Sequence, residues 1–161
     1  MVADQSLTVE DAYKRSLAHF QKGEFKPAVT LLDKIIKAVP NYAQAHQLIG
    51  LTALQLGQME PAEKAMREAI RLVPNNADFL VNFVEVLRKA DKSKEAVEIG
   101  WRAVQFAPKL ASAHSNLGLA YYDTENLEQA ETSQLNALKL DENFVPALNN
   151  LGSIARDNKD E

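Results

Sequence analysis

Three asparagines recur at a constant spacing of 34 residues, and their side chains offer the clearest chemistry in this sequence: Asn82, Asn116 and Asn150. A carboxamide carries two N–H donors and one acceptor oxygen, which match the hydrogen-bonding groups of a peptide unit. Three such side chains on one face would hold an extended chain by its backbone, independently of its sequence. The competing interpretation is that each asparagine bonds locally to a neighbouring helix, and the sequence leaves both open.

The residue types that usually perform catalysis or bind metals are not arranged to do so. His46 and His114 lie 68 residues apart, too far for one metal ion whose ligand bonds are about 2 Å, and His19 falls in a column of packing residues. The chain has no cysteine, which excludes disulfides and thiolate chemistry. No glycine-rich phosphate loop, HExxH run or GxSxG elbow is present. We therefore expect no catalytic residue, no metal site and no cofactor.

A repeat of 34 residues must position these side chains. Pro40, Pro74 and Pro108 share the spacing, and proline ends a helix and excludes the residue before it from helical geometry. Small residues recur in register with the prolines at Ala28, Ala62, Ala96 and Ala130, and at Gly50, Gly118 and Gly152. The period divides the chain into repeats 9–42, 43–76, 77–110 and 111–144, followed by a half repeat or cap at 145–156.

Each full repeat is expected to hold two helices. The first helices are predicted at about 9–21, 43–56, 77–89, 111–123 and 145–156, and the second at about 26–39, 60–73, 93–107 and 127–140. Asn41 and Asn75 are predicted to cap the helices that follow them. Gly100 replaces a bulky residue in the third repeat, and we expect Trp101 to supply the missing volume beside weak local packing.

The pattern resembles that of tetratricopeptide repeats, which place Leu-Gly on the first helix and alanine, a bulky residue and alanine on the second. The second repeat carries Ile49-Gly50, Ala62, Met66 and Ala69, and the fourth carries Leu117-Gly118, Ala130, Gln134 and Ala137. The resemblance implies an all-α fold, a right-handed superhelical solenoid of antiparallel helix pairs, in one domain over residues 1–161. It also implies that the first helices line a concave groove.

The groove-facing columns give the candidate binding residues. The third to fifth repeats resemble the asparagine-ladder repeats of O-linked N-acetylglucosamine transferase. Tyr13, Leu17, Asn82 and Arg88 do not reproduce the carboxylate clamp that holds chaperone tails in some relatives. Leu17, Phe20, Leu51 and Leu54 either form an apolar half-groove or pack between helices, and packing is favoured. The predicted peptide-binding residues are Asn82, Asn116, Asn150, Arg88, Tyr122, Ser115 and Asn149.

Composition and charge narrow the partner. A net charge of −4 with both signs mixed argues against nucleic acid and anionic membranes, because both require a concentrated basic surface. No apolar run is long enough to span a bilayer, and the N-terminus lacks the pattern of a signal peptide. We therefore expect a cytoplasmic protein whose partner is another protein or a peptide.

The final helix keeps repeat character, and Leu148, Leu151, Ile154 and Ala155 lie at helical spacing along it. Leu151 and Ile154 are expected to lack a partner helix, which predicts self-association through this end. Either this helix is a natural cap that ends in the mostly charged residues 156–161, or the chain is a piece of a longer protein, and the repeat character of the helix favours the second explanation. Three functions remain open. They are a protein-interaction scaffold, the N-terminal substrate-recruiting region of a larger enzyme such as a glycosyltransferase or sulfotransferase, and a structural assembly component.

Overall fold

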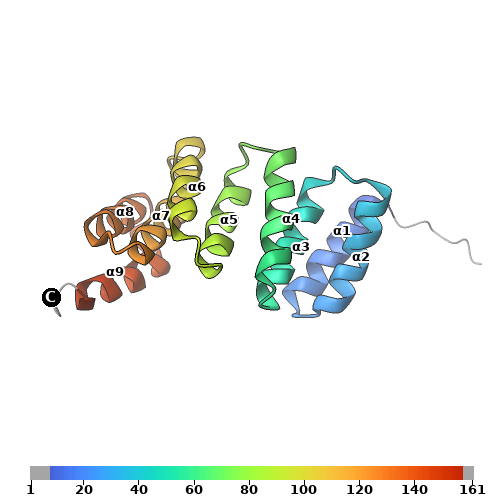
Figure 1. Cartoon of the computed structure of the whole chain (residues 1–161), viewed down its shortest axis with the longest axis horizontal. Coiled ribbons are helices and arrows are strands. Elements are labelled where there is room, and N and C mark those ends of the chain that lie inside the picture. Colours follow the sequence, from blue (N-terminus) through green and yellow to red (C-terminus); the bar gives the residue numbers. More distant parts are fainter. Residues whose placement is uncertain (1–7, 158–161) are drawn as a thin grey trace, which may run out of the picture. The chain divides into compact units, whose positions relative to one another are not determined.

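The computed structural model describes residues 8–157, which form helices joined by short turns (Figure 1). Four antiparallel pairs are followed by a single helix. The elements are α1 (Val9–Gln21), α2 (Phe25–Ala38), α3 (Ala43–Gln55), α4 (Met59–Leu72), α5 (Ala77–Lys89), α6 (Ser93–Phe106), α7 (Ala111–Asp123), α8 (Leu127–Leu140) and α9 (Val145–Asp157).

The chain separates into two compact units. Unit 1 is Met1–Pro74 and contains the hairpins α1–α2 and α3–α4; unit 2 is Asn75–Glu161 and contains α5–α6, α7–α8 and α9. Each unit stacks its hairpins in chain order, as expected for a repeat whose members bury their apolar faces against their neighbours. One continuous domain over residues 1–161 stays a prediction.

The second helices end one residue earlier than the sequence suggested at three of four places. Val39, Val73 and Ala107 have φ of −136°, −135° and −134°, outside helical geometry, because each precedes a proline. Asp141 adopts φ −145° before Glu142, where proline is replaced. An extended residue is therefore needed at this junction of the repeat even without proline.

The predicted asparagine caps are wrong by one residue. An N-cap side chain must come from the residue directly before the helix, and Asn41 and Asn75 lie one position too early. Asn76 caps α5 by accepting a hydrogen bond of 3.1 Å from the Phe79 N–H. Tyr42 precedes α3 and makes no side-chain cap.

The turn inside each hairpin requires a left-handed backbone residue. Gly23 and Gly57 have φ of 74° and 71°, and Asp91 and Glu125 take the same conformation with φ of 58° and 61°. Left-handed geometry costs a residue with a Cβ about 1–2 kcal/mol. Repeats three and four therefore keep this turn at an energetic cost that the glycine repeats avoid.

Alanines form the closest contacts between paired helices. Ala28, Ala62, Ala96 and Ala130 are fully buried, so the paired backbones approach without a large side chain between them. In unit 1, Leu17 and Phe20 pack against a core that contains Leu32 and Leu48. Leu54 is buried, so these apolar residues act mainly in packing rather than in forming an open groove.

The first helices lie on the inner side of each unit. Neighbouring first helices contact one another, α1 with α3 in unit 1 and α5 with α7 and α7 with α9 in unit 2. Over residues 8–157, the second helices are farther apart, with no Cα atoms of α2 and α4, or of α6 and α8, within 8 Å of one another. Stacked hairpins with this pattern curve so that the first helices face inward, as the resemblance implied for the groove.

Packing around Gly100 is close rather than weak, which corrects the expectation there. A Cβ placed on Gly100 would lie 3.2 Å from Leu117 Cα and 3.1 Å from Leu117 Cδ1. The glycine therefore allows α7 to approach α6. Trp101 does not fill the position, because its side chain points outward and is 49% exposed.

The last helix, α9, packs partly against α7 and α8, whereas we expected both Leu151 and Ile154 to lack a partner helix. Ile154 is only 2% exposed, whereas Val145 and Leu148 are 61% and 49% exposed. A Cβ on Gly152 would meet no atom within 4 Å, unlike one on Gly50 or Gly118. The face of α9 that carries Gly152 is therefore open, while the face that carries Ile154 is covered.

Candidate functional site

The candidate site is the inner face of unit 2, defined as the solvent-facing side of α5, α7 and α9. All seven predicted peptide-binding residues lie on these helices. Their side chains have different surroundings, however. Two rows of polar contacts cross the face, and each contact joins residues 35 apart on neighbouring first helices.

The first row contains the asparagines. Asn116 Nδ2 donates to the Val81 carbonyl oxygen at 3.0 Å, and Asn150 Nδ2 donates to Ser115 Oγ at 3.3 Å. Each carboxamide therefore uses one donor to join its helix to the preceding first helix. The side chain of Asn82 has no hydrogen-bond partner within residues 8–157 and is half-buried.

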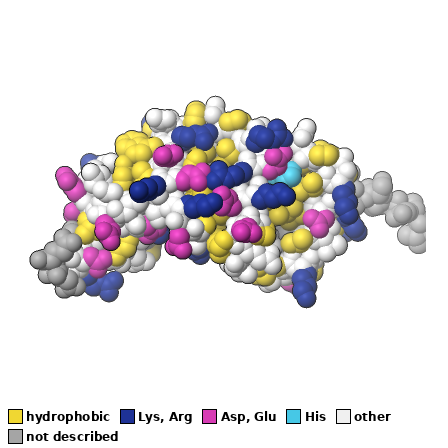
Figure 2. Space-filling model, in the orientation of Figure 1, with side chains coloured by type: hydrophobic (Ala, Val, Ile, Leu, Met, Phe, Trp, Pro, Cys, Tyr) yellow, Lys and Arg dark blue, Asp and Glu magenta, His cyan; other side chains and the backbone are white. Residues whose placement is uncertain are grey.

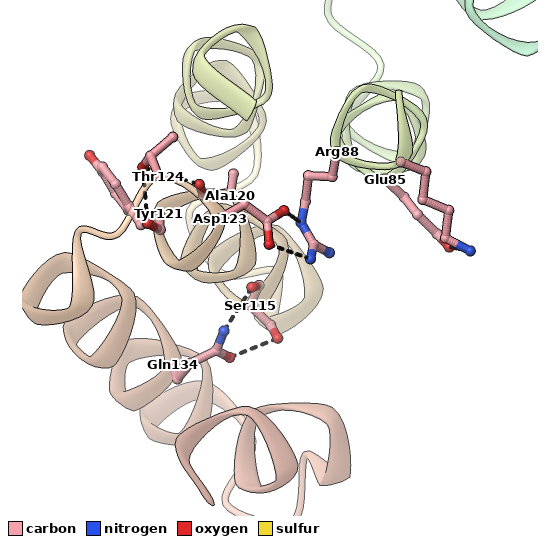
Figure 3. A network of polar contacts seen from close by, with 9 residues as sticks. Glu85, Arg88, Ser115, Ala120, Tyr121, Asp123, Thr124 and Gln134 are labelled. Atoms are coloured by element: carbon pink, nitrogen blue, oxygen red, sulfur yellow. Dashed lines mark hydrogen bonds and ion pairs between the residues drawn. The ribbon is translucent and has the colours of Figure 1, made fainter. Parts of the chain in front are cut away.

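The second row contains Arg88 and Tyr122. The Arg88 guanidinium donates two hydrogen bonds to the Asp123 carboxylate, at 2.6 and 3.1 Å (Figure 3). The Tyr122 hydroxyl donates to the Asp157 carboxylate. This hydrogen bond, followed by desolvation, raises the pKa of Tyr122 above its usual value. Arg88 is therefore engaged by an acid of the same unit and is not a free clamp for a ligand carboxylate.

Ser115 lies beneath the inner face, not on it. It is 1% exposed, and its hydroxyl donates to Gln134 Oε1 at 2.8 Å while Gln134 Nε2 donates to the Ser115 carbonyl at 2.9 Å (Figure 3). Its column varies in size and exposure, with Asn149 exposed. The column alone therefore could not show that the small serine turns toward α8 and is covered.

A cavity of about 130 Å³ opens between the two rows. Apolar and polar groups share its wall, so it suits a small side chain next to a peptide backbone. Its lining includes Arg88, Leu119, Tyr122, Asp123, Asn150 and Ser153. Sequence reasoning did not assign a role to Asp123 or Asp157; the signal that would have found them is an acid 35 residues after Arg88 and Tyr122.

Two of the three histidines contact turns between hairpins, and the third, His19, lies beside Glu24 at the turn between α1 and α2. His46 Nε2 lies 2.8 Å from the Pro40 carbonyl oxygen, and His114 Nε2 lies 2.9 Å from that of Pro108. The described part of the chain contains no group of three or more acidic or histidine side chains placed to hold a metal ion. Within the same residues, no helix has the length and apolar character needed to cross a membrane.

Known proteins with a similar sequence or fold are tetratricopeptide repeat (TPR) proteins. Over 75 residues, 47% of this chain, the sequence is 35% identical to tetratricopeptide repeat protein 17 of Rattus norvegicus, and the match spans 6% of that protein. The fold is similar to that of PilF of Pseudomonas aeruginosa, with a TM-score of 0.85 and 21% identity over 94% of this chain and 69% of PilF.

A further solved structure is the first TPR of Spaghetti (RPAP3) bound to the HSP90 peptide SRMEEVD. It has a TM-score of 0.67 and 22% identity, over 71% of this chain and 91% of that one. These similarities confirm the all-α TPR solenoid. The family model described as "Psidin, N-terminal TPR repeats region" matches residues 18–144, and the chain belongs to this family of TPR regions.

Proposed function

We propose that unit 2 binds an extended segment of a protein partner along its inner face and holds it mainly by the segment's backbone. One observation carries this proposal. Asn116 and Asn150 each donate a single Nδ2 hydrogen bond inside the stack, which leaves a second N–H and the amide oxygen for a ligand. Asn82 continues the same row on α5, and the exposed Asn149 lies next to Asn150 in the sequence of α9.

The chemistry favours a backbone over a terminal carboxylate as the anchored group. The guanidinium best placed to bind a carboxylate, that of Arg88, is paired with Asp123. A similar fold holds the HSP90 peptide in Spaghetti, so the fold is compatible with peptide binding. In this proposal the ligand is held by the carboxamides and by the cavity beside Tyr122, and not by a clamp of basic side chains around a carboxylate.

The test compares an extended peptide with the same peptide methylated at its backbone nitrogens. Array-immobilised peptides of unrelated sequence serve as probes for the whole chain. We expect many unmethylated peptides to bind and the methylated copies to lose binding, because methylation removes the N–H groups that the asparagine oxygens accept. Equal binding of both forms would show that the backbone is not the recognised group.

Variants locate the binding to the inner face. Asn82→Ala removes a carboxamide that makes no hydrogen bond to any described residue, so the fold should be unchanged while binding weakens. Replacing Asn82, Asn116 and Asn150 together should abolish binding, since a neutral hydrogen bond contributes about 0.5–1.5 kcal/mol and three are lost. Asn143→Ala, in an exposed turn outside the face, is the matched control. A triple variant that binds like wild type would remove the ladder from consideration.

We propose a protein or peptide partner in the cytoplasm, not nucleic acid or an anionic membrane. On the face drawn in Figure 2, basic and acidic side chains are interspersed, whereas phosphate backbones require concentrated positive charge. The same inner face would serve an interaction scaffold, the substrate-recruiting region of a larger enzyme or an assembly component. The matched relative is far longer than this chain, so the activity of a whole protein is not assigned.

A second proposal concerns α9. Val145 and Leu148 are exposed and Gly152 faces open space, so a second copy of the chain can cover this face. Light scattering should then show a dimer whose population rises with concentration and falls in Leu148→Ser. A monomer at all concentrations would contradict self-association through α9.

A further inference from the structure

A second pocket of unit 2 lies away from the inner face, between α6, α7 and α8. It has a volume of about 200 Å³, which is comparable to one large side chain. Trp101 and Val104 contribute from α6, Leu117 and Tyr121 from α7, and Glu128 from α8. This outer pocket has no part in the backbone binding proposed above.

The indole of Trp101 is held in place at the mouth of the outer pocket. Its Nε1–H donates to the Tyr121 hydroxyl oxygen at 2.6 Å, although 49% of the residue is exposed. The close approach of α6 to α7 occurs at Gly100 and Leu117, next to this ring. A half-exposed indole that is fixed by a hydrogen bond is the type of residue that anchors a partner.

The charge of the outer pocket favours a cation. Glu128 is the one carboxylate of its lining, and the lining contains no lysine or arginine among the described residues. The imidazole of His114 also lines the pocket, but its Nε2 lies against the Pro108 carbonyl oxygen at 2.9 Å. A positive group in this pocket would lie near an aromatic ring, whose face attracts cations, and near a carboxylate.

We propose that the outer pocket binds an arginine side chain of a protein partner. The alkyl stem would lie on Val104 and Leu117, and the guanidinium would stack on the Trp101 ring with its donors toward Glu128. Arginine fits better than lysine because its planar, weakly hydrated group stacks on aromatic rings. Unit 2 would then contact a partner on two separate surfaces, and either contact can exist without the other.

The test uses the only tryptophan of the chain as a reporter. A blocked glycine–arginine–glycine tripeptide is titrated into the whole protein, and a copy with citrulline, which is isosteric and uncharged, serves as the matched probe. The fluorescence and the indole N–H resonance of Trp101 should change with peptide concentration in a saturable way, and the curve should give a dissociation constant on the order of 1–10 mM. The arginine peptide should bind about 2- to 30-fold more tightly than the citrulline peptide. Equal affinities, or no response at about 10 mM, would overturn the proposal.

Two variants test the named side chains. Glu128→Gln should weaken the arginine peptide by about 1.5- to 5-fold and leave the citrulline peptide unaffected. Glu131→Gln, an exposed acid on the same helix that does not line the pocket, should change neither. Trp101→Leu should remove the preference for arginine. Because this variant lacks the tryptophan reporter, peptide binding to it is measured by backbone amide chemical shifts. A preference that survives both Glu128→Gln and Trp101→Leu would place the recognition elsewhere.

Discussion

The hairpins α3–α4 and α7–α8 share one backbone design and differ in the residue that faces the glycine of the first helix. Gly50 faces Met66, whereas Gly118 faces Gln134, and both second-helix residues are fully buried. A buried amide is costly unless it is hydrogen-bonded, and both ends of the Gln134 amide are satisfied by Ser115. The repeat therefore requires a side chain of this size opposite the glycine, and that side chain can be polar only where the first helix supplies a hydrogen-bond partner.

The buried Gln134 of α7–α8 links the core to the inner face, which the buried Met66 of α3–α4 cannot do. Ser115 Oγ also accepts from Asn150, so the buried pair in α7–α8 extends to a carboxamide on the inner face. The candidate site of unit 2 thus rests on a hydrogen-bonded core, and changes in the two hairpins should have unequal effects.

The largest difference is expected for alanine at the two glycines. In Gly118→Ala the new Cβ would lie 2.5 Å from Gln134 Nε2 and 3.1 Å from the Ala130 carbonyl, so the amide must leave its partners. We expect the free energy of unfolding to fall by about 2–4 kcal/mol. Gly50→Ala should cost less, about 1–2 kcal/mol, because the Met66 side chain, 2.9 Å away at Cγ, can move without losing a hydrogen bond, although the Ala62 carbonyl at 3.2 Å is almost as close as its counterpart at Gly118. Urea unfolding followed by far-UV circular dichroism measures both, and equal losses would refute the comparison.

Exchanging the buried residues tests the hydrogen bonds directly. Met66→Gln places an amide in an apolar site and should lower the free energy of unfolding by about 2–3 kcal/mol. Gln134→Met should cost about 1–2 kcal/mol, since Ser115 loses both hydrogen bonds to the Gln134 amide but keeps the one from Asn150, and its hydroxyl can donate within α7. Hydrogen exchange of the α4 and α8 amides would assign each loss to its hairpin. A harmless Met66→Gln would mean that α3 also offers a partner.

Gly152 provides the third member of the same glycine column. A Cβ added at this position of α9 would have no atom within 4 Å, so Gly152→Ala should raise the free energy of unfolding by about 1 kcal/mol through helix propensity. Thermal unfolding gives the sign. A destabilised Gly152→Ala would show that another surface, such as a second copy, packs on this face.

The smallest expected effect is the pH dependence of Tyr122. Its hydrogen bond to Asp157 raises the pKa of the phenol in the folded state, so folding favours the protonated form. This contribution to stability is complete below the unfolded pKa of about 10 and is lost as pH rises through the folded pKa. The melting temperature of wild type should fall more steeply above that pH than the melting temperature of Tyr122→Phe. Identical slopes would show that the hydroxyl contributes nothing to the second row.

The helices were predictable because their limits depend on local chemistry. The structure matches the bounds expected for the first helices of repeats one, three and four and for α8. Proline and glycine limit helices locally, and the 34-residue period shows where these limits recur. The direction of individual polar side chains was not predictable. Whether Asn116 faces solvent or the Val81 carbonyl depends on the offset between neighbouring helices. The same offset decides that Arg88 meets Asp123.

In both rows of unit 2, each contact joins two residues that are 35 apart in the sequence, so equivalent positions of successive repeats make equivalent contacts. Position by position, Asp157 corresponds to Asp123 and Asn150 to Asn116. Deleting residues 111–144 would bring Arg88 opposite Asp157 and Asn150 opposite the Val81 carbonyl, and so recreate both junctions. Loss of one whole repeat would therefore keep these two junctions, whereas the hydrogen bond from Trp101 to Tyr121 would be lost, because Ala155 would take the place of Tyr121.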